Sequence, residues 1–447
     1  MNILVLGNGF DLAHGLPTKY SDFLDWIVAE VEFWEDLKKQ GSDIANRMKL
    51  LPLKMNIPKE KRRKKQIDSR INHQVELWEC INENVWFEYF LQCDMYGKEN
   101  WIDFESEIGK VIKTIEKDMK KESGKDSVVK RIRLSFFDMF FIENMDEKEQ
   151  ARDDEGYRSI ADKKWDVSKT AEYMEKYREE HPVKREKEII TYANLIRRLE
   201  CDLDRLIRAL EIYFCEYVSA MEVTLLAPNI KQLSIDKVLS FNYTNTYENL
   251  YGKDRNIGYD YIHGEADIEN TIETNNMVLG IDEYLSDDRK DKDVEFIAFK
   301  KFYQRIYKGA RCKYKDWIYE IKSSYEPYLK SVNNRYTSQI SLSEITQHGG
   351  KVHNLYIFGH SLDVTDKDIL RDLILNDNVN TTIFYRERKD ENGKCDNGRE
   401  DLAQKITNLV KIIGQDELIR KTGGTLRTIN FEKQENMINA GDEVNGK

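Results

Sequence analysis

The stretch that decides the fold opens the chain, where residues 1–17 read MNILVLGNGFDLAHGLP. The apolar residues 2–6 predict a short buried strand, and the glycines behind them predict a sharp turn into a helix. In a parallel sheet such a turn presents backbone N–H groups to a phosphate, and a glycine lacks the Cβ that would block a pyrophosphate. Glycines also simply end many strands, but the position at which a nucleotide-binding fold would begin favours phosphate binding. The candidate residues of this turn are Gly7, Asn8, Gly9, Phe10 and Asp11.

The composition limits the classes of protein to which the chain can belong. It has 447 residues, of which 34% are charged, and its net charge of −11 argues against sequence-independent binding to nucleic acid. A basic run at residues 59–65 is better interpreted as a solvated loop between helices. No apolar stretch approaches the roughly 20 residues that cross a bilayer, and six scattered cysteines form no Cys-x-x-Cys pair. We therefore expect a cytoplasmic protein with reduced thiols, which partners neither a membrane nor a nucleic acid.

Strand-like segments lie at the two ends of the chain. Several are continuous apolar runs, which suit parallel strands that are covered by helices on both faces. The expected strands are residues 2–6, 237–241, 261–262, 277–279, 352–358, 381–385 and 426–431.

The middle of the chain predicts helices instead. Apolar residues recur every three or four positions over 20–34 and 195–217, the pattern of amphipathic helices, and the charged stretch 117–187 is expected to be helical too. We predict an α/β fold in which residues 1–40 and 230–447 form a nucleotide-binding core, a parallel sheet flanked by helices. A large α-helical insertion, residues 41–229, enters this core after the first strand and is a candidate regulatory or partner-binding part.

Two polar side chains follow expected strands at the sheet edge where ligands of parallel sheets bind. Asn242 comes directly after the strand at 237–241, and its amide can hold a ribose hydroxyl or position a water, or else cap the next turn. His263 follows the apolar pair at 261–262 and precedes Gly264. An imidazole titrates near neutral pH and can act as a general base toward a ribose hydroxyl, while a structural histidine is the alternative.

A third element, residues 355–366, combines a buried strand with a Gly-x-Ser motif at Gly359 and Ser361. Ser361 and the N–H groups beside it are candidates for holding a phosphate or a ribose oxygen. A nucleophilic serine is the other interpretation. The Gly-x-Ser-x-Gly elbow of esterases is not present, because Asp363 stands where its second glycine would be.

Taken in order, these motifs resemble those of the sirtuin fold family, which read Gly-Ala-Gly-x-Ser to Gly-Ile-Pro, Gln-Asn-x-Asp, His-Gly and Gly-x-Ser-Leu-x-Val. Asn242 matches the asparagine and His263 the catalytic histidine of that family, and the remaining matches are Gly7, Gly9, Gly15, Pro17, Gly264, Gly359, Ser361, Leu362 and Val364. The resemblance implies a Rossmann-type sheet that binds NAD.

The chain more closely resembles the AbiH family of bacterial abortive phage-infection proteins. The motifs typical of that family are Gly-Asn-Gly-Phe-Asp from residue 7, Trp-Ile-Asp-Phe-Glu from 101, Ser-Phe-Asn-Tyr-Thr from 240, His-Gly from 263 and Gly-His-Ser-Leu from 359. This resemblance implies an anti-phage role and covers most of the chain. Within the second motif, Asp103 and Glu105 are best interpreted as acids that favour the first turn of a helix, with a place in the substrate cleft as the alternative.

The departures from the sirtuin motifs narrow the expected chemistry. Asp11 replaces a serine, Thr244 replaces the acid of Asn-x-Asp, and residues 18–20 replace an Asp-Phe-Arg whose ring and cation hold the nicotinamide end. No cysteine quartet for zinc lies between His263 and Gly359, which argues against protein deacylation.

The sirtuin motifs that the chain does match imply hydrolysis of the nicotinamide glycosidic bond of NAD. Asn242 and His263 are the expected catalytic residues, with NAD as substrate and with neither a metal nor a prosthetic group. A sensor that binds NAD or ADP-ribose without turnover is the main alternative, and an effector surface on the helical insertion is another. A phage-derived trigger, a protein partner or self-association is expected for an enzyme that a healthy cell must keep inactive.

Overall fold

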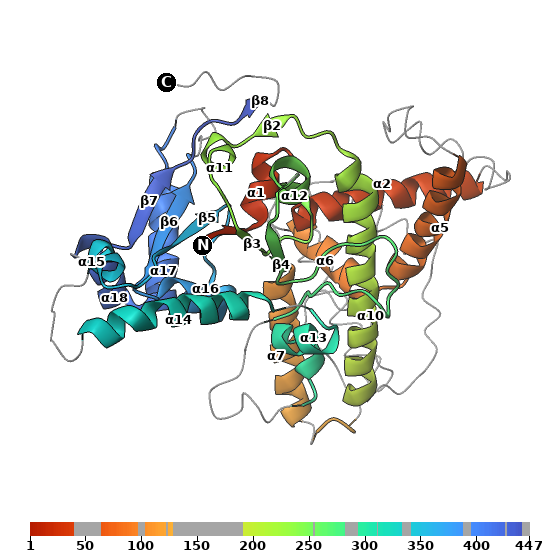
Figure 1. Ribbon diagram of the computed structural model, residues 1–447. Helices are drawn as coiled ribbons and strands as arrows, with labels where there is room; N and C mark the ends of the chain where they lie inside the picture. Colours follow the sequence, from red (N-terminus) through yellow and green to blue (C-terminus); the bar gives the residue numbers. More distant parts are fainter. Residues whose placement is uncertain are drawn as a thin grey trace.

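The computed structural model describes residues 1–39, 64–96, 103–121, 124–127, 191–253, 255–281, 294–310, 312–332, 341–387, 395–424 and 427–439. Within these ranges it has a mixed α/β architecture. A six-stranded sheet lies on one side of the molecule and a group of long helices on the other (Figure 1). None of the helices that the structure describes is long and apolar enough to cross a membrane.

All six strands of the sheet are parallel, in the order β4-β3-β1-β5-β6-β7. The central strand β1 (Asn2–Leu6) pairs with β3 (Lys237–Ser240) on one side and with β5 (His353–Phe358) on the other. The edges are β4 (Gly258–Tyr261) on the β3 side, and β6 (Val379–Tyr385) followed by β7 (Ile429–Lys433) on the β5 side. The chain thus builds outward from β1 first in one direction and then in the other, so that the strand order reverses between β1 and β5.

Apolar residues on both faces of the sheet explain why its strands read as continuous hydrophobic runs. On one face Ile3 and Val5 pack against α14 (Tyr314–Val332), α16 (Lys367–Ile374), α17 (Arg399–Ile413) and α18 (Gln415–Gly423). On the other face Leu4 and Leu6 pack against α1 (Asn8–Ala13), α11 (Pro228–Lys231) and α12 (Thr246–Tyr251).

The long helices form a third hydrophobic core of their own. It contains side chains from α2 (Tyr20–Lys39), α5 (Lys64–Ile81), α6 (Val85–Tyr96), α7 (Phe104–Lys121) and α10 (Tyr192–Ile212). The ring of Phe104 stacks on Tyr20 and on Phe90, with centroids 4.1 and 4.0 Å apart. Met277, Leu279, Phe296 and Phe299 join this core from the chain that follows β4. The helical layer is therefore built from the expected insertion together with segments on either side of it.

Most of the expected elements are present. The helices at 20–34 and 195–217 are confirmed as α2 and as α10, which continues into a π-helical turn at Tyr213–Tyr217. The strands are confirmed with boundary shifts in β4 and β7, but the strand expected at 277–279 is wrong. Leu279 exchanges backbone hydrogen bonds with the Gln304 side chain, and Val278 donates to His263, so no neighbouring strand pairs with this segment. Most of the basic run at 59–65 and of the charged stretch at 117–187 lies outside the described residues.

The turns after β1 and β5 are in direct backbone contact. Gly7 donates its N–H to Phe358 O at 3.2 Å, and Gly9 donates to Gly359 O at 2.8 Å. A Cβ on Gly9 would lie 2.7 Å from Gly359 O, and one on Gly359, whose φ is +68°, would lie 2.1 Å from the Phe10 nitrogen. These glycines are therefore required because two loops meet without space for a side chain.

Replacement of Gly359 by alanine tests this contact. We expect Gly359→Ala to lower the free energy of unfolding by about 2–4 kcal/mol, since the left-handed backbone costs about 1–2 kcal/mol and the clash adds further strain. Gly15→Ala is the matched control, because Gly15 has a φ of +79° but has nothing within 4 Å of its Cβ position. Chemical denaturation followed by tryptophan fluorescence compares the two, and equal losses would contradict the proposed role of the clash.

Candidate functional site

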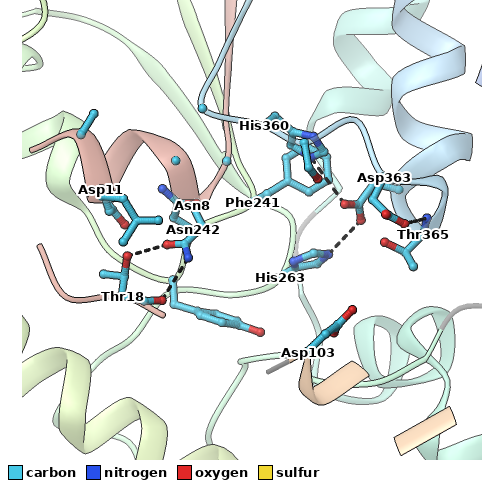
Figure 2. Close-up of a pocket in the computed structure, with 18 of the residues that line it drawn as sticks. Asn8, Asp11, Thr18, Asp103, Phe241, Asn242, His263, His360, Asp363 and Thr365 are labelled. Atoms are coloured by element: carbon cyan, nitrogen blue, oxygen red, sulfur yellow. Dashed lines mark hydrogen bonds and ion pairs between the residues drawn. The ribbon is translucent and has the colours of Figure 1, made fainter. Parts of the chain in front are cut away.

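A cavity of about 820 Å³ opens at the carboxyl ends of the parallel strands. Its walls come from the chain that follows each of the six strands, with additions from α17 and from the helical layer. This is the edge of an open α/β sheet at which ligands bind, and the volume suits a small-molecule ligand. The expected site residues that border it are Gly7, Asn8, Gly9, Asp11, Asn242, His263, Gly359 and Ser361. Figure 2 shows Asn8, Asp11 and Asn242 gathered on one side, with His263 and His360 on the other.

The turn after β1 differs in detail from the expected phosphate cradle. The N–H groups of Gly7 and Gly9 are engaged by the β5 loop, and Phe10 donates its N–H to Gly7 O at 2.8 Å. The Phe10 ring is fully buried in the core beneath the turn. The Asn8 side chain is held by Thr18, since its Nδ2 donates to Thr18 O and its Oδ1 accepts from the Thr18 hydroxyl. Phosphate binding by this turn stays a prediction.

Asp11 is buried beside Asn242, with 1% and 6% of their surfaces exposed. Thr244 donates its hydroxyl to Asp11 Oδ2 at 2.6 Å and in turn accepts from the Thr246 hydroxyl. Burial raises the pKa of Asp11 to about 6, while the neighbouring polar side chains of Thr244, Thr246 and Asn242 act in the opposite direction. Among the described residues, neither Asp11 Oδ1 nor Asn242 Oδ1 has a hydrogen-bond partner.

His263 belongs to a buried group of charges on the opposite wall. Its Nε2 lies 3.5 Å from Asp366 Oδ1, which also faces the Lys301 ammonium at 3.7 Å. Lys301, only 2% exposed, makes a closer ion pair with Glu105 at 2.7 Å. Burial and the positive charge of Lys301 lower the pKa of His263 to about 4, so its imidazole is neutral at pH 7.

Lys301 faces two carboxylates, those of Glu105 and Asp366. Burial acts to raise the pKa of Asp366, but the ammonium of Lys301 holds this pKa well below its usual range. Burial acts to lower the pKa of Lys301, yet Glu105 and Asp366 together raise it. Burial raises the pKa of Glu105 to about 7 despite its ion pair with Lys301. Lys301 therefore stays charged, and Asp366 stays a carboxylate beside the imidazole.

His360 is a second imidazole on the same carboxylate. Its Nδ1 accepts the N–H of Leu362 at 2.9 Å, so the neutral ring carries its proton on Nε2, which lies 3.4 Å from Asp366 Oδ2. The loop is further fixed by α17, where Lys405 donates to His360 O and Asn408 donates to Ser361 O. Leu362 is held at a φ of +58°, a conformation that non-glycine residues rarely adopt. This loop therefore has a fixed shape before any ligand binds.

The two acids at the start of α7 have different roles. Asp103 is a helix cap, because its Oδ1 accepts the N–H groups of Glu105 and Ser106 at 3.0 and 3.2 Å. Glu105 instead turns into the cavity and binds Lys301. Tyr20 also borders the cavity while its ring stacks on Phe104.

Sequence reasoning did not assign roles to Lys301, Asp366 or His360. His360 lies in the Gly-His-Ser-Leu stretch after β5 and Asp366 follows four residues later, so their position after a strand end was a usable signal. Lys301 begins α13 (Lys301–Tyr307) and has no neighbouring motif, so its burial was not visible in the sequence. Over the described part of the chain, no set of three His, Cys, Asp or Glu side chains is arranged to hold a metal ion.

A family model described as bacteriophage abortive infection AbiH matches residues 3–386. The chain belongs to the AbiH family. The match extends from β1 to the residue after β6, so it includes five of the six strands whose carboxyl ends border the cavity and leaves out β7. Membership in AbiH indicates a role in abortive infection by bacteriophage. Comparisons with curated proteins and with solved structures find no match. The resemblance to the sirtuin fold stays a prediction.

The titration of His263 tests the electrostatics of this AbiH site. We expect its imidazole to titrate near pH 4, because burial and the adjacent ammonium oppose protonation. Lys301→Met should raise this pKa toward the ordinary value of about 6.5, whereas Lys301→Arg keeps the charge and should leave it low. Histidine ¹⁵N NMR, with the signal assigned by its loss in His263→Gln, measures the pKa. A wild-type transition near 6.5 would contradict the assignment.

Proposed function

We propose that this AbiH protein is an abortive-infection effector that hydrolyses NAD to nicotinamide and ADP-ribose in the cavity described above. The observation that carries the proposal is the meeting of Asn242 and His263 at one cavity, although they follow different strands. The Gly7–Asp11 turn and Ser361 border the same cavity from two further strands. Numbered in chain order, the six parallel strands follow the sequence 3-2-1-4-5-6, which is the order of many dinucleotide-binding sheets and supports a Rossmann-type, sirtuin-like core.

The reaction requires little from the protein beyond positioning and charge stabilisation. The bond between ribose C1′ and the pyridinium nitrogen breaks, and its electron pair neutralises the positive ring, so nicotinamide leaves without a proton. The sugar becomes oxocarbenium-like, and a water oxygen then bonds to C1′. One proton from this water must be accepted by the enzyme and passed to solvent.

His263 is suited to accept that proton. A base must be unprotonated at the working pH, and the low pKa of His263 meets this requirement at pH 7. Asp366 faces Nε2, so the carboxylate favours the tautomer with the proton on Nε2 and leaves Nδ1 as the basic nitrogen. Figure 2 shows the other ring nitrogen on the side of Asn242. Asn242 positions the water or the nicotinamide ribose.

Recognition of the dinucleotide falls to the loops after β1 and β5. The predicted contacts are from Asn8 and its turn to the pyrophosphate, and from Ser361 to an oxygen on the adenosine side. Arg386 borders the cavity after β6 and supplies a cation for a phosphate there. The rival function, a sensor that binds NAD without turnover, uses the same contacts and differs only in whether the ligand is recovered intact.

Release of nicotinamide tests the proposal. We expect purified protein mixed with NAD, with and without extracts of phage-infected cells, to release nicotinamide measurable by chromatography. Asn242→Ala and His263→Ala should each lower the rate about 10²- to 10³-fold, through loss of positioning and of the base. Asn249→Ala and His348→Ala are the matched controls, because both side chains are exposed and lie outside the cavity.

The outcomes separate the two candidate functions. Release that persists in both site variants would exclude this site. Binding by calorimetry with NAD recovered intact under every condition would favour the sensor.

A further inference from the structure

Three oxygens of cavity-lining residues lack a hydrogen-bond donor among the described residues, and one of them, Asp366 Oδ1, already faces His263 and Lys301. Asp11 Oδ1 and Asn242 Oδ1 are both screened from solvent, and neither accepts a hydrogen bond from the residues described in the structure. Leaving such an atom unpaired costs about 1–3 kcal/mol, and more when the group is charged. Both residues line the cavity, so a ligand that enters it can supply the missing donors.

The carboxylate of Asp11 is held in place before a ligand arrives. Its Oδ2 accepts the Thr244 hydroxyl, whose own oxygen accepts from Thr246. Both threonines stand on the chain that follows β3, as Asn242 does, whereas Asp11 stands on α1. The Asp11 carboxylate is thus fixed at the junction of the β1 and β3 loops, which leaves Oδ1 as its oxygen available to a ligand.

The chemistry of these acceptors excludes a phosphate as their partner. Phosphate oxygens are acceptors and carry negative charge, so they would repel Asp11 and leave both oxygens unpaired. The adenine amine and the nicotinamide carboxamide each carry their two donors on a single nitrogen. A ribose offers two hydroxyl donors on neighbouring carbons, which suit two acceptors on separate side chains.

We propose that Asp11 and Asn242 form a subsite for the 2′- and 3′-hydroxyls of the nicotinamide ribose. This assignment rests on the proposed function for the identity of the ligand. It assigns Asp11 to binding of the sugar instead of the expected binding of phosphate. It also predicts that the site binds ribose in preference to 2′-deoxyribose. A carboxylate at the 2′-hydroxyl also places negative charge near C1′, where positive charge develops when the glycosidic bond breaks.

The subsite can be tested by comparing the binding of NAD analogues that have or lack one ribose hydroxyl. This comparison requires no turnover. The probe is the NAD analogue whose nicotinamide ribose has a methylene in place of the ring oxygen, because it cannot form an oxocarbenium ion. Its affinity is measured by calorimetry beside two versions, one lacking the 2′-hydroxyl on the nicotinamide side and one lacking it on the adenosine side. We expect wild-type protein to bind the first version roughly 10- to 100-fold more weakly and the second with less than about a threefold change.

Variants separate this role from a general effect of charge. Asp11→Asn should reduce the preference on the nicotinamide side to less than about threefold, because the charged acceptor is lost. Asp103→Asn removes a carboxylate from the same cavity, but an asparagine can still cap α7, so the preference should persist. Circular dichroism verifies that each variant is folded.

The outcomes distinguish this inference from the proposed function. Nicotinamide release from NAD together with equal binding of all three probes would overturn the subsite and leave hydrolysis standing. Selective loss of affinity without the nicotinamide-side hydroxyl, in a protein that never releases nicotinamide, would support the subsite and overturn hydrolysis. A preference located on the adenosine side, or no binding of the parent probe, would overturn the subsite.

Discussion

The close contact between the turns after β1 and β5 is the constraint on which the site depends. Gly9 donates to Gly359 O, and neither glycine has space for a Cβ. This contact occurs where the strand order reverses, so it joins the two halves of the sheet at their common centre. Because the turns are locked together, the side chains just beyond them, Asp11 on one and His360 on the other, have fixed positions across the cavity.

A second constraint joins the sheet to the helical layer. Lys301 pairs with Glu105, which stands in the first turn of α7, and faces Asp366, which follows β5. A buried ammonium between two carboxylates is stable only while both partners remain near it. The position of α7 against the sheet is thereby coupled to the charge around His263, so a movement of the helical layer would change the electrostatics of the proposed base. The helical layer therefore contributes directly to the electrostatics of the cavity.

Much of the sheet could be predicted from the sequence, whereas the site could be predicted only in part. Apolar residues located all six strands, but β4 and β7 only in part, because these edge strands are less buried than the central ones and carry polar residues. Residues 277–279 were wrongly predicted to be a strand, because their apolar side chains pack into the helical core while the backbone of Leu279 bonds to Gln304. Asn242 and His263 could be predicted as site residues because each directly follows an expected strand. Lys301 could not be found, because its burial depends on partners distant in the chain.

The acidic character of the cavity determines how an anionic dinucleotide can lie in it. Two of the departures from the sirtuin motifs, Asp11 and Thr244, are in contact, so a carboxylate and a hydroxyl face each other across the β1 and β3 loops. That carboxylate and Asp366 both line the cavity. Negative charge there favours a sugar that becomes cationic and disfavours a phosphate. For the proposed NAD ligand, the diphosphate is therefore expected toward Asn8, Ser361 and Arg386, with the glycosidic bond, rather than the phosphate bond, beside His263. The charge distribution of the cavity thus supports the proposed cleavage at the ribose over one at the pyrophosphate.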